Sequence, residues 1–256
     1  MGFLQGEHLQ TACSVLGGKE TGDVVAHAPI ISRSPRSTGT RAGSSTRMEA
    51  CVATRTSRNP LYSGVQVGLP CPPPSTVGGM LAAAAGGWQH IPATFRFAMA
   101  FHAQGHGIDL ETYHPLDAKG RPTTPVPKDR EFLAFPALTA WITEQPEWWQ
   151  GILRRPVWPL HLGRSQDLVG LRLATVEPAR DAGEQRGAIV EDVPGTAGTA
   201  LRLPTAIRLD RTRTVWGTYR HDAAGTASSV VPGSYRTPAG QAVSLLPPTH
   251  PATAEA

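Results

Sequence analysis

Arginine is the side chain of this sequence best suited to chemistry, and the chemistry it suggests is phosphate binding. The 256 residues include 24 lysines and arginines against 20 acidic residues, for a formal net charge of +4. Only Lys19, Lys119 and Lys128 are lysines. The planar guanidinium group binds phosphate oxygens with two hydrogen bonds and stacks on bases. A GC-rich genome also enriches arginine, so this composition permits a polyanionic partner without proving one.

Histidine and cysteine spacing does not predict a metal site. His102 and His106 are four residues apart, but glycines surround them and no third ligand has suitable spacing. Cys13, Cys51 and Cys71 are odd in number and lack C-x-x-C spacing, so neither a disulfide framework nor a zinc site is expected. We expect a reducing, cytoplasmic setting.

Cofactor-dependent chemistry has no signature in the sequence. The aspartates and glutamates are scattered, without the paired arrangement of a two-metal nuclease. A P-loop and a dinucleotide-binding fingerprint are both absent. We therefore expect no cofactor and no bound metal.

The stretch from Pro72 to Gly87 predicts a short helix made almost entirely of small residues. Three prolines hold the chain extended, Ser75 stands at the N-cap position, and Val77 to Ala85 forms the helix that Gly86 and Gly87 end. Free N–H groups near Ser75 and Thr76 could bind a phosphate or carboxylate. Small residues would let another backbone approach closely; the alternative is a helix packed tightly on a sheet.

Hydrophobic patterns around this helix predict an α+β domain of the ferredoxin-like, or split βαβ, type over residues 48–176. A strand opens at Met48, and a second helix has a proline in its first turn. Pro136 implies an edge or a bulge. The other expected elements are strands at 94–102, 131–142, 157–162 and 168–176 and a helix at 146–153, with the turn Gly163-Arg164-Ser165 between the last two strands.

The flanking segments and one insertion differ in composition from this domain. Residues 1–47 are rich in Ser, Thr, Gly and Arg and are expected to be a disordered extension. Residues 102–130 form a long polar insertion whose bases are Lys119, Arg121, Lys128 and Arg130. We predict a small β-rich C-terminal extension at 177–246 and a disordered tail at 247–256. The apolar run at 77–85 is too short to span a bilayer, so no membrane partner is expected.

Two motifs carry a resemblance to a known family. The sequence NPLYSGVQVGLPCPPPSTVGGMLAAAAGG, followed later by RRPVWPLHLGRSQDLVGL, resembles the Cas-five family of CRISPR-associated proteins over roughly residues 48–176. The resemblance implies a ferredoxin-like domain of the repeat-associated (RAMP) superfamily. It implies a subunit of a type I Cascade effector that binds the 5′ handle of CRISPR RNA (crRNA) and contacts the backbone and large subunits. The insertion at 102–130 occupies the place of that family's thumb.

Combined with the residue types, this resemblance yields a set of candidate RNA-binding residues. Ser75 and Thr76 would offer hydroxyl and amide donors, and Arg164 would offer a guanidinium from a rigid turn. The remaining candidates are Arg58 and Tyr62 as a basic–aromatic pair and the thumb bases Lys119, Arg121, Lys128 and Arg130. Each also has an ordinary structural role: Ser75 as a cap, Arg164 in a surface ion pair, Arg58 in solvent and Tyr62 in the core.

Catalysis is not predicted, but one enzymatic alternative stays open. A branch of the resembled family cleaves precursor crRNA without metal, which requires a base for the 2′-OH and an acid for the leaving oxygen. Tyr113, His114, Lys119 or His161 could serve, although their spacing matches no motif. The main prediction is a non-catalytic RNA-binding subunit; the alternatives are a metal-independent endoribonuclease and a protein scaffold without RNA contacts.

Overall fold

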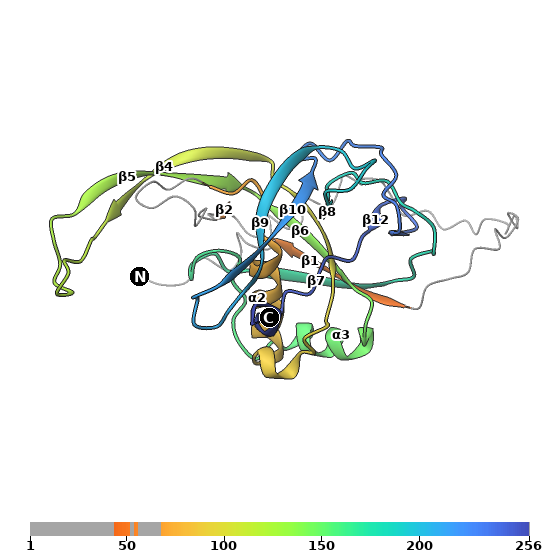
Figure 1. Ribbon diagram of the computed structural model, residues 1–256, viewed down its shortest axis with the longest axis horizontal. Helices are drawn as coiled ribbons and strands as arrows, with labels where there is room; N and C mark the ends of the chain where they lie inside the picture. The colour runs from red at the N-terminus through yellow and green to blue at the C-terminus, as the bar shows by residue number, and fades with distance from the viewer. Residues whose placement is uncertain (1–43, 52–53, 56–67, 256) are drawn as a thin grey trace, which may run out of the picture.

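The computed structural model describes residues 44–51, 54–55 and 68–255 (Figure 1). Its first strand, β1 (Ser45–Cys51), pairs antiparallel with two neighbours inside the main sheet. Ser45 and Thr46 are buried. The folded domain therefore begins before Met48, the start predicted from the sequence, because residues 45–47 already pair with the sheet. Residues 1–43 of the predicted extension lie outside the described residues.

The main sheet has seven strands in the order β7-β1-β6-β3-β8-β10-β9, and every neighbouring pair is antiparallel. The strands after β1 are β3 (Ala98–His102), β6 (Ala137–Ile142), β7 (Gly170–Val176), β8 (Ala188–Glu191), β9 (Thr199–Ile207) and β10 (Thr214–His221). Because β8 pairs with β3, the region after residue 176 continues the main sheet. The predicted region at 177–246 does contain strands, but three of them, β8, β9 and β10, belong to the main sheet and do not form a small extension beside it.

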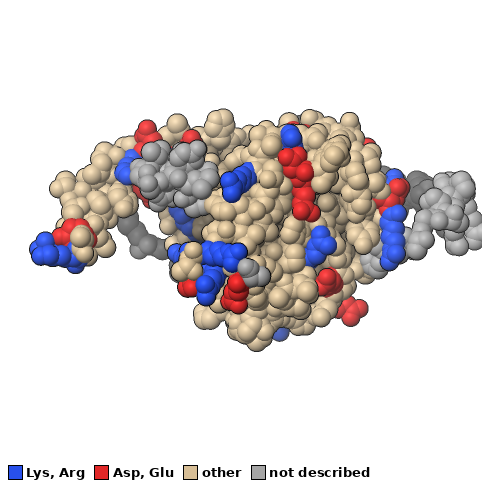
Figure 2. Space-filling model, in the orientation of Figure 1, with Lys and Arg blue, Asp and Glu red and all other residues tan. Residues whose placement is uncertain are grey.

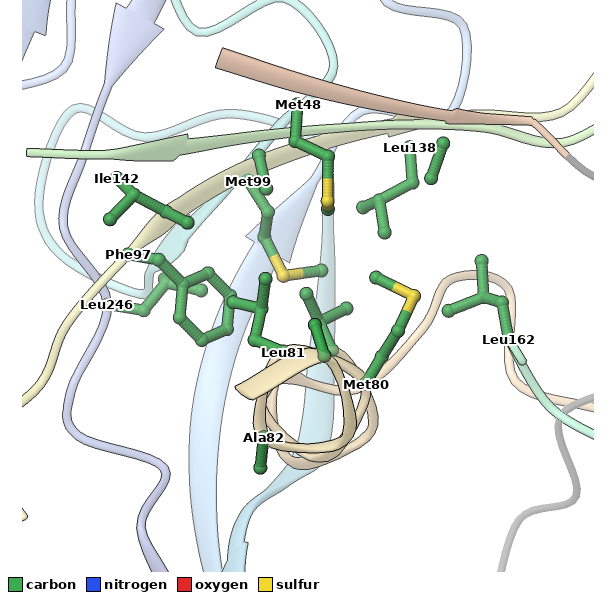
Figure 3. Close-up of a cluster of buried hydrophobic side chains, with 14 of the residues drawn as sticks. Met48, Met80, Leu81, Ala82, Phe97, Met99, Leu138, Ile142, Leu162 and Leu246 are labelled. Atoms are coloured by element: carbon green, nitrogen blue, oxygen red, sulfur yellow. The ribbon is translucent and has the colours of Figure 1, made fainter. Parts of the chain in front are cut away.

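Two helices cover one face of strands β7, β1, β6 and β3. Helix α2 (Pro74–Ala85) lies between β1 and β3 in the chain, and α3 (Pro146–Arg154) lies between β6 and β7. Alternate strand residues face these helices, so Met48, Met99 and Leu138 meet the side chains of α2 in the core (Figure 3). The predicted alternation and both helices are found, within a few residues of the expected bounds.

Small residues in α2 serve the packing of the protein on itself. A Cβ atom built on Gly78 would lie 2.1 Å from Oγ1 of Thr249, so only glycine fits there. The helix begins after Pro73, which makes no side-chain cap, and Gly86 ends it with φ of 89°. Ser75 is therefore inside the first turn and is not the N-cap, in contrast to the prediction.

The C-terminal residues pack against α2 and against strands β9 and β10. The 3₁₀ helix η2 (Pro251–Ala254) buries Pro251 and Ala254. His250 donates its Nε2–H to the carbonyl of Trp88, 3.2 Å away, in the 3₁₀ helix η1 (Trp88–His90). The prediction of a disordered tail is thus wrong for residues 247–255. On the opposite face of the sheet, β11 (Tyr235–Arg236) and β12 (Ala242–Val243) bring Val243 and Tyr235 over Trp141.

A long β-hairpin projects from the body and contains most of the predicted thumb insertion (Figure 1). It consists of β4 (Gly105–Tyr113) and β5 (Val126–Ala134), with the short β2 (Thr54–Arg55) paired to β5 at its base. The strand expected at 131–142 is divided, because Phe135 adopts φ of 46° between β5 and β6. The strand expected at 157–162 is also absent; only His161 forms an isolated bridge, to Leu168.

Candidate functional site

A cavity of about 400 Å³ lies where the hairpin joins the main sheet. Its walls come from four segments that are distant in the sequence. The polar side chains are His106, Glu131 and His221, the apolar lining is Leu69, Pro70, Phe101, Ala103, Phe132, Leu133 and Ala223, and Gly68 and Gly105 complete it. The volume falls within the range of roughly 300–1,000 Å³ that is typical of small-ligand sites.

His221, at the end of β10, is the buried titratable group of this cavity. Burial lowers its pKa below the ordinary value of 6.5, although the hydrogen bond to the Phe101 carbonyl partly opposes this shift. His221 Nε2 lies 3.1 Å from that oxygen, which can only accept, so Nε2 carries the proton. In the neutral ring Nδ1 is then an acceptor. The cavity is therefore walled by an uncharged imidazole at pH 7.

The turn after His221 is held by one carboxylate. Asp222 accepts hydrogen bonds from the backbone N–H groups of Ala224, Thr226 and Ala227. Burial alone would raise the pKa of Asp222, but these hydrogen bonds outweigh it and lower the pKa. The same turn places the carbonyl of Ala223 3.2 Å from His102 Nδ1. A hydrogen-bonded turn thus forms the cavity wall beside His221.

The hairpin supplies the opposite wall. Glu131 accepts a hydrogen bond of 2.7 Å from the backbone N–H of Gly68, which ties the segment before α2 to β5. His106 and Leu133 are paired in register. Phe132 packs over Gly107, where an added Cβ atom would lie 2.8 Å from the ring. Glu131 and His106 therefore share one face of the hairpin base, whereas the Phe132 ring packs over Gly107 on the other face.

The two predicted thumb bases on β5, Arg130 and Lys128, already interact with side chains on β4. Arg130 forms ion pairs with Asp109 and with Glu111, the latter at 3.0 Å, and its side chain is 12% exposed. The Lys128 ammonium lies 4.9 Å from the centre of the Tyr113 ring. Because these partners already neutralise or cover both cations, they are less available to phosphates than the sequence suggested.

The two predicted bases at the hairpin tip are more accessible. Asp117 accepts hydrogen bonds from the backbone N–H groups of Lys119 and Arg121, and it pairs with Arg121 Nε at 2.9 Å. Hydrogen bonds from Arg121 and Lys119 lower the pKa of Asp117. The Arg121 side chain remains 71% exposed, and Figure 2 shows basic and acidic side chains together at the far end of the hairpin. The tip thus presents cations from a fixed turn.

Arg164 lies in the predicted turn, but its guanidinium binds within the turn. Its Nη2 is 2.9 Å from Asp167 Oδ1, and its Nε is 3.2 Å from Asp167 Oδ2. Gly163 adopts φ of 117°, which favours glycine. Nη1 of Arg164 is buried and has no hydrogen-bond partner. Of the two roles considered for Arg164, the ion pair is the one that the geometry displays.

The remaining candidates are not gathered at the cavity. Ser75 and Thr76 lie in the first turn of α2, and the Ser75 hydroxyl is buried without a hydrogen-bond partner. Arg58 and Tyr62 lie outside the described residues. Within the described ranges, no hydrogen bond or ion pair joins Ser75 or Thr76 to Arg164 or to the hairpin bases.

The residues considered for catalysis are also dispersed. Tyr113 ends β4, His114 follows it and Lys119 is at the hairpin tip, whereas His161 precedes β7 with its Nδ1 buried and unpartnered. Across the described part of the chain, no three His, Cys, Asp or Glu side chains are grouped to hold a metal ion. None of its helices is long and apolar enough to cross a membrane.

Sequence reasoning did not identify most of the cavity residues. Phe101, Glu131, Phe132 and His221 were not singled out, and His106 was considered only as a metal ligand. One local signal was present: the glycines on both sides of His106. The contact between His221 and Phe101 spans 120 positions, which no local pattern encodes.

Comparisons with solved structures give distant likenesses. A chain of a "CRISPR RNA-guided surveillance complex" aligns at TM-score 0.48 and 17% identity, covering 82% of this chain and 92% of that one. A CRISPR protein from Archaeoglobus fulgidus gives TM-score 0.48 and 11% identity, covering 80% and 99%. A chain of a Type III-B Cmr-beta structure bound to cognate target RNA gives 0.42 and 9%, covering 73% and 85%. These low values carry no conclusion about function.

Family comparison is more informative. No curated protein sequence matches this chain. The family model described as CRISPR-associated protein (Cas_Cas5) matches residues 58–239, which is well over half of the chain. The resemblance in the sequence covered roughly residues 48–176. The family match extends beyond residue 176 and includes β8, β9 and β10. The chain therefore belongs to the Cas5 family of CRISPR-associated proteins.

Proposed function

We propose that this protein is a non-catalytic subunit of a type I CRISPR effector complex that binds the 5′ handle of crRNA. In this proposal it contacts neighbouring backbone and large subunits. The order of strands β7-β1-β6-β3, with helices after β1 and β6, supports the proposal of a ferredoxin-like unit of the RAMP type. Membership of the Cas5 family supports the CRISPR setting.

The cavity at the hairpin base is the observation that carries the RNA-binding proposal. Single-stranded RNA is commonly recognised by stacking of splayed bases on aromatic rings and by hydrogen bonds to base edges. Phe101 and Phe132 line this cavity together with His106, Glu131 and His221. A neutral His221 adds a hydrogen-bond acceptor without a charge. These groups suit the flat, polar-edged shape of a nucleobase.

Phosphate contacts would come from outside the cavity. Lys119 and Arg121 project from the tip of the same hairpin, and the whole chain carries a formal net charge of +4. Phosphate contacts position a nucleic acid, whereas base contacts select its sequence. The hairpin would thus hold the RNA backbone at its tip and one or more bases at its base.

The test uses the full chain, co-expressed with the other effector subunits and a CRISPR array. We expect intact crRNA to co-purify. His106→Ala should lower the RNA recovered per complex, whereas His90→Ala, an exposed histidine in η1 on the body of the protein, should not. Recovery of RNA-free complex with normal subunit content would contradict the proposal and favour a scaffold.

Cleavage is assessed in the same experiment. Precursor crRNA incubated with the purified chain in a chelator should remain intact. Site-specific cleavage that His114→Ala or His161→Ala abolishes would establish the endoribonuclease alternative instead.

A further inference from the structure

Among the described residues, strand β7 forms one edge of the main sheet. It is the last strand in the order of the main sheet and, within the described ranges, it pairs only with β1. In an edge strand, alternate backbone N–H and C=O groups point outward without a strand partner. Proteins usually cover or blunt such an edge. The side chains around β7 therefore indicate what kind of partner could cover it.

An apolar groove of about 700 Å³ runs beside this edge, between the end of α3 and β7. Leu171 and Leu173 of β7 line it together with Leu153, Leu160, Leu168 and Val169. Leu168 remains 47% exposed, and the nearby Trp158 is 59% exposed. Leu171 and Leu173 are alternate residues, so an added strand would direct every second side chain toward this groove.

The groove is bordered by basic residues. Arg154 lines it and Arg155 follows at the end of α3, whereas Arg172, between the two leucines of β7, faces the opposite side of the sheet. All three are exposed. Among the described residues, none of the three forms an ion pair with a carboxylate. The surface therefore combines unpaired backbone groups, an apolar floor and positive charge.

We infer that the β7 edge binds an extended segment of a partner protein, added to the sheet as a further strand. The segment has apolar residues at alternate positions and acidic residues between them. Main-chain hydrogen bonds supply affinity in this mode of recognition, and pockets for alternate side chains supply specificity. The apolar side chains enter the groove beside Arg154 and Arg155, while the acidic ones face the other side of the sheet and meet Arg172.

Other occupants fit less well. A second copy of this chain pairing edge to edge would bring Arg172 toward another Arg172, and like charges opposite each other destabilise strand pairs. RNA would match the arginines but gains little from an apolar floor or a strand edge. Residues 1–43 of this chain contain four basic and three acidic residues, so they are not an acidic segment.

The test measures binding of the full chain to a short fluorescent peptide of alternating valine and glutamate. The control is a peptide of the same length with lysine in place of every glutamate. Arg172→Glu should weaken binding of the acidic peptide by about tenfold and improve binding of the lysine peptide. Arg180→Glu with Arg211→Glu, two exposed arginines elsewhere, should change neither by more than about twofold.

Strand addition has its own readout. Methylating alternate backbone nitrogens of the peptide should abolish binding in one register and spare it in the other, because only one row of N–H groups faces β7. Equal binding of the two charge forms, or equal effects of the two methylation registers, would overturn the inference.

The alternative occupants are distinguished in two further arms. Displacement of the peptide by unstructured RNA, weakened by the same arginine substitution, would assign the groove to RNA and overturn the inference. A photo-crosslinking amino acid at position 158, in the full chain within the assembled complex, should crosslink to another subunit. Crosslinks confined to residues 1–43, or to a second copy, would also overturn it.

Discussion

Asp167 holds Arg164 by two side-chain hydrogen bonds, to Nη2 at 2.9 Å and to Nε at 3.2 Å, and it also accepts from the Arg164 backbone N–H at 3.0 Å. The Asp167 side chain is 2% exposed, whereas that of Arg164 is 24% exposed. The arginine that the sequence suggested for phosphate binding therefore neutralises a buried carboxylate. Its loss acts first on the fold of this turn.

Replacing Arg164 should lower stability. Arg164→Ala leaves the Asp167 carboxylate without its cation, and we expect the free energy of unfolding to fall by about 1.5–3 kcal/mol, the usual range for hydrogen bonds to charged groups. Arg164→Lys should recover only part of this, because an ammonium cannot form the bidentate contact. Denaturant unfolding checks both. An unchanged midpoint for Arg164→Ala, with weaker RNA binding, would restore the phosphate-binding role.

Two adjacent glycines in α2 allow a matched test of helix packing. A Cβ on Gly78 would meet Thr249 at 2.1 Å, whereas a Cβ on Gly79 would meet nothing within 4 Å. Gly78→Ala should destabilise the protein by about 1–3 kcal/mol through overpacking. Gly79→Ala should stabilise it by up to about 1 kcal/mol, because alanine has the higher helix propensity. Thermal unfolding of both variants measures the difference; equal shifts would mean that the C-terminal segment does not pack on α2.

The sequence predicted the strands whose residues alternate between the core beneath the helices and the opposite face of the sheet. Strands β1, β3 and β6 have one side on the core, so the period of two is visible in their residues. The β4–β5 hairpin projects from the body and buries neither face, so its polar sequence looked like a loop. The tail at 247–255 looked disordered from its composition, because the space that Gly78 leaves for Thr249 is a tertiary feature.

The candidate site was harder to predict for the same reason. Its walls are brought together by strand pairing between distant segments, as when β3 and β5 place Phe101 and Phe132 on one cavity. The charges in the sequence also did not show which cations already have partners, because Arg130 and Lys128 contact residues on β4 that only the strand register identifies. Residue type indicated a capacity for phosphate binding, but not which cations already have partners.

The buried His221 should make stability depend on pH. Its folded pKa lies below 6.5, so between that pKa and 6.5 the unfolded chain binds the additional proton. The contribution of His221 to stability is therefore present at higher pH and is lost as the pH falls below about 6.5. His221→Gln, whose amide can still donate to the Phe101 carbonyl, should flatten this dependence. Denaturation at several pH values checks it; identical slopes for the two proteins would contradict the burial of a neutral ring.

Two lysines on the same hairpin distinguish available from occupied cations. Lys119 is exposed at the tip, whereas the ammonium of Lys128 lies over the Tyr113 ring. If RNA phosphates contact the tip, Lys119→Ala should weaken crRNA binding and reduce the slope of log affinity against log salt concentration by about 0.7, the value for one contact to a single strand.

Lys128→Ala is the matched control, because it removes a lysine from the same hairpin and lowers the net charge equally. It should change the slope much less, since its cation already has an aromatic partner. The measurement is crRNA affinity of the full chain at several salt concentrations for the wild type and both variants. Equal slope changes would show that only net charge matters, and a larger change for Lys128→Ala would place the phosphates along β5 instead of at the tip.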